Sequence, residues 1–135
     1  MSLIAALKES PAILSKASTF TWMCGVFYMA VGALLLLWPG AAQALLRDPD
    51  FVGHEAALMR LLGMCGLGIG WLYFFGGRSG GRQVVAATVL DRIVLVPIVL
   101  VPTALSGVLP HTLLLFAVTD PTLAVVSWIL LSRRD

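Results

Sequence analysis

Four charged side chains lie within sequence segments that are otherwise apolar. Asp91 and Arg92 stand side by side within residues 84–107, and Asp120 lies near the middle of residues 111–131. Arg60 lies one turn inside a third apolar segment, residues 56–75. A charged group at membrane depth is costly, so it usually faces the protein interior, pairs with another group and has a function. These four residues form the predicted charge cluster.

Two interpretations of this cluster remain open. In the first, the four side chains line a polar cavity that holds a small molecule or relays a proton. In the second, they form a charge network that fixes how the helices align. The sequence contains no HExxH motif, no histidines with metal-ligand spacing and no hydrolytic triad. It therefore predicts no catalytic residue, no metal site and no cofactor, and it favours a protein without enzymatic activity.

The composition indicates a membrane protein. Of the 135 residues, 59% are hydrophobic and only 12% are charged, with a mean hydropathy of +0.96. Soluble domains carry about 25% charged residues, so lipid is expected to cover much of this apolar surface. The net charge of +2 gives no argument for a nucleic-acid partner. Cys24 and Cys65 lie in apolar runs without a CxxC motif, which is typical of small buried side chains.

We predict an all-α fold, an integral membrane four-helix bundle that forms one transmembrane domain over residues 1–135. About 20 apolar residues are needed to cross a hydrocarbon core, and four segments meet this length. The predicted helices cover residues 18–38, 56–75, 84–107 and 111–131. Residues 2–16 are expected to form an interfacial helix interrupted by Pro11, and residues 41–46 a short interfacial turn.

Prolines in the last two predicted helices suggest that both are broken. Pro97 and Pro102 each remove a backbone donor from the third helix. Pro121 follows Asp120 directly and disfavours helical geometry at that residue. Some carriers place binding sites at breaks of this kind.

A stripe of small residues marks the second helix. Gly63, Gly66 and Gly70 share one face, and the last two have the GxxxG spacing that allows close contact between helices. The stripe predicts a tight neighbour, either within the chain or in another copy. A homo-oligomer formed through this helix is therefore a candidate assembly.

The distribution of cations predicts the orientation. In a four-helix topology six cations fall on one side of the membrane, namely Lys8, Lys16, Arg78, Arg82, Arg133 and Arg134. The positive-inside rule then places both termini in the cytoplasm. At about 1.5 Å per residue, Arg92 and Asp120 lie within about 4 Å of the same depth, so we predict that these two residues pair.

Several short motifs resemble a known family. They are HEAALMRLLG at residues 54–63, a glycine-rich helix that ends in aromatic residues, the Asp91-Arg92 pair, and FAVTDP at residues 116–121. Together they resemble the BphX-like group, a family of small uncharacterised bacterial four-helix inner-membrane proteins, some of which are encoded beside genes for aromatic-compound degradation. The resemblance implies a bacterial inner membrane and hydrophobic substrates, and it implies no catalytic residue.

These observations lead to two functional predictions. The first is a membrane protein that binds or transports a hydrophobic small molecule, aromatic compounds included, at the Asp/Arg cluster. The second is a non-catalytic accessory or scaffold subunit of a larger membrane complex, suggested by the glycine stripe. Membrane lipids are expected partners in both.

Overall fold

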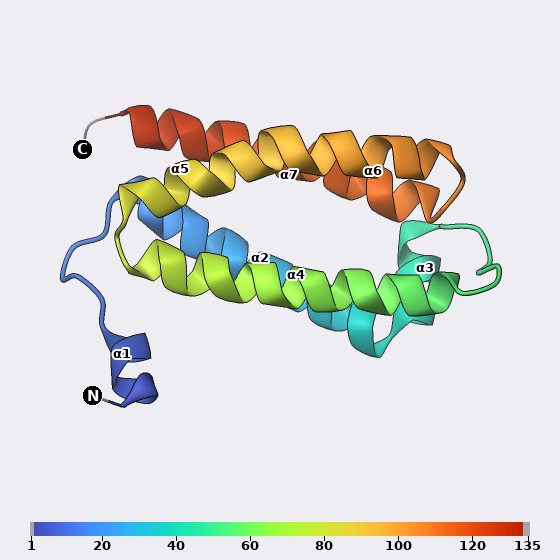
Figure 1. Cartoon of the computed structure of the whole chain (residues 1–135), viewed down its shortest axis with the longest axis horizontal. Coiled ribbons are helices and arrows are strands. Elements are labelled where there is room, and N and C mark those ends of the chain that lie inside the picture. Colours follow the sequence, from blue (N-terminus) through green and yellow to red (C-terminus); the bar gives the residue numbers. More distant parts are fainter. Residues whose placement is uncertain (1, 134–135) are drawn as a thin grey trace.

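The computed structural model describes residues 2–133, and within them the secondary structure is entirely helical (Figure 1). The predicted all-α fold is confirmed. The elements are α1 (Leu3–Lys8), α2 (Lys16–Leu37), α3 (Pro39–Leu46), α4 (Glu55–Arg78), α5 (Arg82–Leu90), the π-helix η1 (Asp91–Leu95), α6 (Val96–Leu105) and α7 (Pro110–Ser132).

Four helical segments are long and apolar enough to cross a membrane. They are α2, α4, the continuous run α5-η1-α6 and α7. Their ends differ little from those expected from the sequence. The largest difference is at the end of α4, which reaches Arg78 because Gly76 and Gly77 stay helical.

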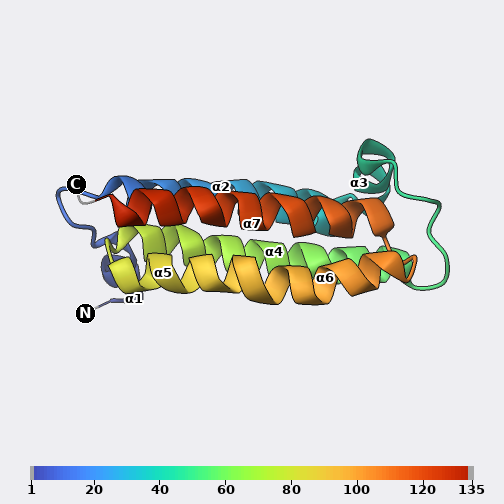
Figure 2. The same ribbon diagram turned by 90° about the horizontal axis from the view of Figure 1, so that it is seen from above.

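The four spans form two antiparallel pairs. α2 packs along α4, and α5-η1-α6 packs along α7. Figures 1 and 2 show the first pair lying beside the second, with both chain ends at the same end of the molecule. α7 also contacts α2, and α5 contacts α4, whereas α4 and α6 hardly touch. The two pairs therefore meet more closely on one side of the bundle than on the other.

Glycines hold α2 and α4 very close together. They recur every seven residues, as Gly25 and Gly32 in α2 and as Gly63, Gly70 and Gly77 in α4. A seven-residue repeat keeps the same face toward the partner when two helices supercoil gently. A Cβ atom added at any of these five glycines would lie 2.4 to 2.6 Å from a backbone nitrogen of the other helix. No larger residue fits there unless the helices separate.

The tight neighbour predicted for Gly63, Gly66 and Gly70 is thus α2 of the same chain. Gly66 lies slightly off the line of closest approach, since a Cβ there would be 3.3 Å from the Cα atom of Gly32. The helix face that the sequence offers for contact with another copy is covered within the chain.

The predicted break in the last helix is wrong. α7 runs without interruption through Asp120 and Pro121 to Ser132. A proline removes a single backbone donor, and neighbouring helices in a bundle compensate for that loss. Packing against α2, α5, η1 and α6 keeps α7 helical on both sides of Pro121.

The third span is distorted, but it is not broken. The backbone N–H of Val96 donates to the carbonyl of Asp91, five residues earlier instead of four. Pro97 follows and has no N–H to donate. The distortion predicted from the prolines therefore takes the form of a π-turn, and this turn begins at the charged pair Asp91-Arg92. Such turns are frequent at functional sites.

The N-terminal helix is shorter than expected. Residues 2–16 were predicted as one interfacial helix with an interruption at Pro11, but α1 ends at Lys8 and the chain is not helical again until Lys16. Figure 1 shows α1 away from the four spans. Ser10 fixes this segment to the α4–α5 turn by donating to the carbonyl of Arg78 over 3.0 Å.

The turn expected at residues 41–46 is the helix α3. Directly after it, the buried carboxylate of Asp48 accepts hydrogen bonds from the backbone N–H groups of His111, at 2.7 Å, and Thr112, at 3.1 Å. It also accepts from the Thr112 hydroxyl. Leu109, which precedes α7, has no side chain that could satisfy these donors. Asp48 therefore caps α7 from a distant loop.

The glycine contact gives a stability prediction. Gly70→Ala places a methyl group 2.6 Å from the Met29 nitrogen, so we expect it to lower the free energy of unfolding by about 1–3 kcal/mol, as overpacking does. Unfolding in detergent micelles measures this change. Gly68→Ala is the matched control, because nothing lies within 4 Å of that Cβ position and alanine favours the helix. Equal stability of the two variants would contradict the proposed contact.

Candidate functional site

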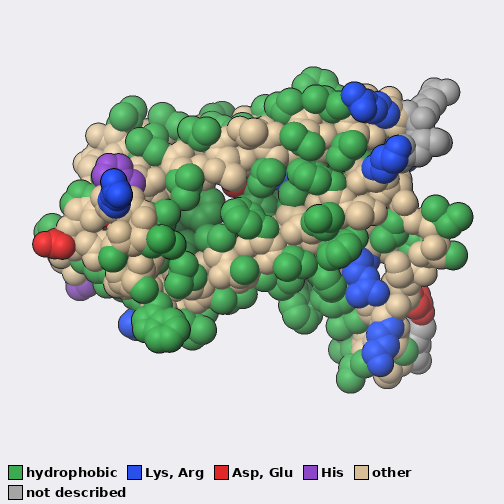
Figure 3. Space-filling model, turned by 180° about the vertical axis from the view of Figure 1, so that it is seen from behind, with side chains coloured by type: hydrophobic (Ala, Val, Ile, Leu, Met, Phe, Trp, Pro, Cys, Tyr) green, Lys and Arg blue, Asp and Glu red, His purple; other side chains and the backbone are tan. Residues whose placement is uncertain are grey.

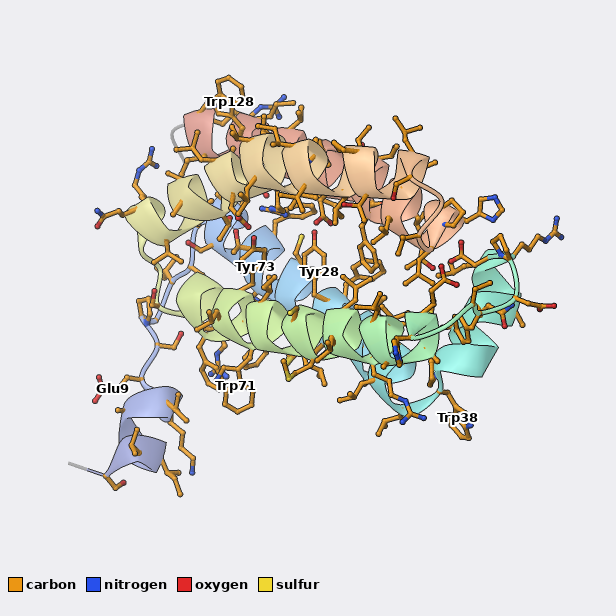
Figure 4. All side chains as sticks on the ribbon, turned by 45° about the vertical axis from the view of Figure 1, so that its right-hand side comes forward. Glu9, Tyr28, Trp38, Trp71, Tyr73 and Trp128 are labelled. Atoms are coloured by element: carbon orange, nitrogen blue, oxygen red, sulfur yellow. The ribbon has the colours of Figure 1, made fainter. Side chains whose placement is uncertain are left out.

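Two tyrosines connect the helix pairs at the centre of the bundle. Tyr28 of α2 donates a hydrogen bond to Oδ1 of Asp120 in α7 over 2.5 Å. Tyr73 of α4 donates to Oδ2 of Asp91 in η1 over 3.1 Å. Figure 4 shows both tyrosine side chains reaching from α2 and α4 toward the opposite pair. Each carboxylate of the pair α5-η1-α6 and α7 thus accepts a hydrogen bond from a tyrosine of the pair α2 and α4.

The two tyrosine rings also contact each other. Their centroids are 5.6 Å apart and their planes are 85° to one another, the edge-to-face arrangement that aromatic rings favour. Both residues are buried, with exposed fractions of 4% for Tyr28 and 7% for Tyr73. The ring contact fixes the positions of the hydroxyl groups, and so it fixes the spacing of the two hydrogen bonds to the acids.

Arg92 is the largest fully buried side chain among the described residues, with an exposed fraction of 1%. Its Nε donates to the Thr88 carbonyl over 3.0 Å, and its Nη2 donates to the Thr88 and Ser127 hydroxyls, each over 3.1 Å. The guanidinium lies 5.2 Å from the centroid of the Tyr73 ring. Nη1 has no hydrogen-bond partner in the described part of the chain. The arginine is therefore held by neutral groups and by an aromatic face.

The predicted Arg92–Asp120 pair does not form as a direct ion pair within residues 2–133. Asp120 bonds to Tyr28, while the arginine side chain runs back along its own helix to Thr88. Helical side chains lean toward the N-terminus, which accounts for this direction. Both side chains are nevertheless buried in the same helix bundle. An estimate of depth along the helix axis carries no information on the direction of the side chains.

Arg60 does not join the cluster. Its side chain is exposed on the outside of α4, whereas the preceding residue Met59 is completely buried. Successive residues in a helix differ by about 100° in direction, so an inward Met59 and an inward Gly63 leave Arg60 facing out. The structure brings Asp91, Arg92 and Asp120 together and leaves Arg60 outside.

A cavity of about 410 Å³ lies beside the two carboxylates, between the helix pairs. Among the described residues, Asp91 and Asp120 are the only carboxylates in its wall, and Tyr28 and Tyr73 lie next to them. The rest of the wall is apolar or small: Gly32, Leu35, Leu62, Cys65, Gly66, Ile69, Leu95, Val96, Val99, Leu100 and Phe116.

The cavity opens sideways, between α4 and α6. The wall residues Cys65 and Ile69 of α4 are exposed, as are Leu95 of η1 and Val99 of α6, with exposed fractions of 58% and 51% for the last two. The wall residues of α2, in contrast, are buried. The opening arises because α4 and α6 hardly touch. In a membrane this side of the span would face lipid.

Tyr28 and Tyr73 were missing from the predicted site. Tyrosine is uncharged at neutral pH, so a search for charged residues within apolar segments does not find either side chain. A signal was present for Tyr28, because it lies on the same helical face as Gly25 and Gly32 in the middle of an apolar span. A buried tyrosine hydroxyl needs a hydrogen-bond partner, and Asp120 was an available acceptor.

No protein-family model, curated protein or solved structure matches this chain. The resemblance to the BphX-like group therefore stays a prediction. In the part of the chain that the structure describes, no three His, Cys, Asp or Glu side chains gather as metal ligands would. The site has to be interpreted from its own residues.

The tyrosine–aspartate bonds give a prediction that a double-mutant cycle tests. Tyr28→Phe and Asp120→Asn should be coupled by about 1.5–3 kcal/mol, the usual range for a hydrogen bond to a charged group. The measurement is reversible unfolding of the single and double variants in mixed micelles. The control cycle combines Tyr28→Phe with Asp91→Asn, whose groups share no hydrogen bond, and should show much weaker coupling. Equal coupling in both cycles would argue against a specific Tyr28–Asp120 bond.

Proposed function

We propose that this chain is a small integral membrane protein that binds or transports a hydrophobic small molecule, aromatic compounds included, at the intramembrane site of Asp91, Arg92 and Asp120. The observation that carries this proposal is the cavity of about 410 Å³ beside the two carboxylates. Binding pockets for small molecules typically measure about 300–1,000 Å³ and combine apolar walls with a few polar groups. This cavity has that size and that composition.

The cavity also supports one of the two interpretations of the charge cluster over the other. Protein interiors are close-packed, and voids much larger than a water molecule are few. A network that only aligned the helices would be expected to lie among tightly packed side chains. Here Asp91 and Asp120 instead form part of the wall of an unfilled space. This favours ligand binding over a purely structural role.

The sideways opening supports access from the lipid phase. A hydrophobic compound concentrates in the bilayer, and the apolar residues around the opening, Ile69, Leu95 and Val99, offer no barrier to it. Binding and transport would use the same opening and the same cavity. Membrane lipids are the immediate surroundings of the site in either case.

The proposed setting is the bacterial inner membrane, with both termini in the cytoplasm. The cations Lys8, Lys16, Arg78, Arg82 and Arg133 belong to segments near the two chain ends and the α4–α5 turn. Figure 3 shows Lys and Arg side chains gathered at this end. Arg134, the sixth cation of the predicted set, lies outside the described residues. This asymmetry agrees with the positive-inside rule.

The alternative, an accessory or scaffold subunit, rested on the glycine stripe of the second helix. Gly63 and Gly70 contact α2 of the same chain, and Gly66 lies close to it. The stripe therefore offers little surface to a partner protein. For this reason we argue for the ligand-binding function.

A thermal-shift experiment tests the proposed function. The detergent-purified protein is heated with a panel of aromatic and lipid-like compounds, and Asp120→Asn is measured beside the wild type. A compound that binds only the folded protein raises the melting temperature with its concentration, by an amount that reflects its Kd. We expect such a shift for at least one hydrophobic compound, and a smaller shift in the variant. A panel without any shift would argue for the structural interpretation.

Two tryptophan variants locate the binding site. Val99→Trp places a large side chain at the opening of the cavity, and we expect it to reduce the ligand-induced shift at least several-fold. Val94→Trp is the matched control, because Val94 is 50% exposed on the same span, close to the 51% of Val99, but does not line the cavity. If both variants bind the compound as the wild type does, the ligand does not occupy this cavity.

A further inference from the structure

We infer that the ligand of this cavity is a lipophilic organic cation, a protonated amine carried on an apolar body. The inference rests on the proposed binding function and adds the chemical class of the ligand. It is based on which ionisable groups face the cavity, and on which of their atoms remain without a hydrogen-bond partner.

The charges in the cavity wall are of one sign. Asp91 and Asp120 line the cavity, and no Lys, Arg or His among residues 2–133 lies in its wall. Arg92 is adjacent but does not line it, since its guanidinium is directed to Thr88, Ser127 and the Tyr73 ring. A ligand with an anionic group would meet two carboxylates in the wall, and the one nearby cation, Arg92, is not part of that wall. A ligand with a cationic group would meet its complement.

The carboxylates retain unused acceptors. Asp120 is 8% exposed, so it is more than nine-tenths buried, and it bonds through Oδ1 to Tyr28. Its Oδ2 has no hydrogen-bond partner among the described residues, although the side chain faces the cavity. Asp91 bonds through Oδ2 to Tyr73, and its Oδ1 is likewise without a partner there. An ammonium group has three N–H donors and can satisfy such oxygens.

A count of charges points to the same class of ligand. The centre of the bundle contains two carboxylates and one guanidinium, which leaves one negative charge when both acids are ionised. The other titratable groups around them, Tyr28, Tyr73 and Cys24, add no positive charge. Uncompensated charge in an apolar environment is costly. A monocation in the cavity would balance it.

The apolar walls of the cavity indicate the size and polarity of the uncharged part of the ligand. Apart from the tyrosine–aspartate end, the lining is formed by glycine, cysteine, aliphatic side chains and Phe116. A volume of about 410 Å³ accepts an aromatic body of two fused rings with a short side chain. A small hydrophilic amine would leave most of this apolar wall uncovered. The expected ligand therefore has its amine at the acidic end and its rings between α4 and α6.

Three probes with the same apolar body test the charge of the ligand. They are naphthylethylamine, which is a cation at neutral pH, naphthylethanol, which is neutral, and naphthylpropionic acid, which is an anion. Their dissociation constants are measured with the full chain in detergent by calorimetry. We expect the amine to bind roughly tenfold or more tightly than the alcohol, and the acid to bind most weakly.

The double variant Asp91→Asn/Asp120→Asn removes the acids and keeps their shape. We expect it to bind the amine and the alcohol about equally, with alcohol binding close to that of the wild type. It also corrects for unequal partition of the probes into the micelle. Should this variant fail to fold, the order of the three probes on the wild type, and its loss in Val99→Trp but not in Val94→Trp, still decides the question.

The outcomes separate this inference from the proposed function. If the alcohol or the acid binds the wild type as tightly as the amine, the cation assignment is wrong and the hydrophobic binding site stands. If the amine keeps its advantage in the double variant, the acids do not recognise it and the assignment is again wrong. If none of the three probes binds, the proposed function and this inference fail together.

Discussion

Polar groups inside an apolar helix bundle need partners, because neither lipid nor hydrocarbon side chains can replace water. In this chain that requirement falls on Asp91, Arg92 and Asp120, which all belong to one helix pair. Tyrosines from the other pair satisfy the two acids, and threonine and serine hydroxyls satisfy most of the arginine. The bonds of Tyr28 and Tyr73 therefore join the two halves of the bundle and set their spacing.

The two helix pairs are built on different principles. Glycines bring α2 and α4 into backbone contact, which makes this pair a compact unit. α5-η1-α6 and α7 instead carry the buried charges and the prolines, and a π-turn begins at the charged residues. The closely packed pair α2–α4 cannot pack along its full length against a pair in which one span contains a π-turn. The cavity lies where the two helix pairs do not pack against each other, directly beside the tyrosine–aspartate hydrogen bonds.

The cavity and the buried carboxylates together support ligand binding more strongly than either feature does alone. An apolar void alone would suggest imperfect packing, and a buried carboxylate alone would suggest a structural bond. Here Asp120 has one oxygen bonded to Tyr28 and the other without a partner at the cavity wall. Such an arrangement orients the carboxylate from one side and leaves it available from the other. The proposed ligand-binding function rests on this arrangement.

The sequence by itself determined the number, length and helical nature of the four apolar segments. Hydropathy and length are local properties, and the need to satisfy backbone groups in a membrane leaves the helix as the only simple solution for them. It also identified Asp91, Arg92 and Asp120 as the unusual side chains, since a charge in an apolar run is visible without a fold. Only the tertiary structure decided which way each side chain points, because a step of one residue, about 100° around the helix axis, can separate an inward residue from an exposed one. That is why Arg60 proved to be exposed, why Arg92 bonds to Thr88 instead of Asp120, and why Tyr28 and Tyr73 entered the site.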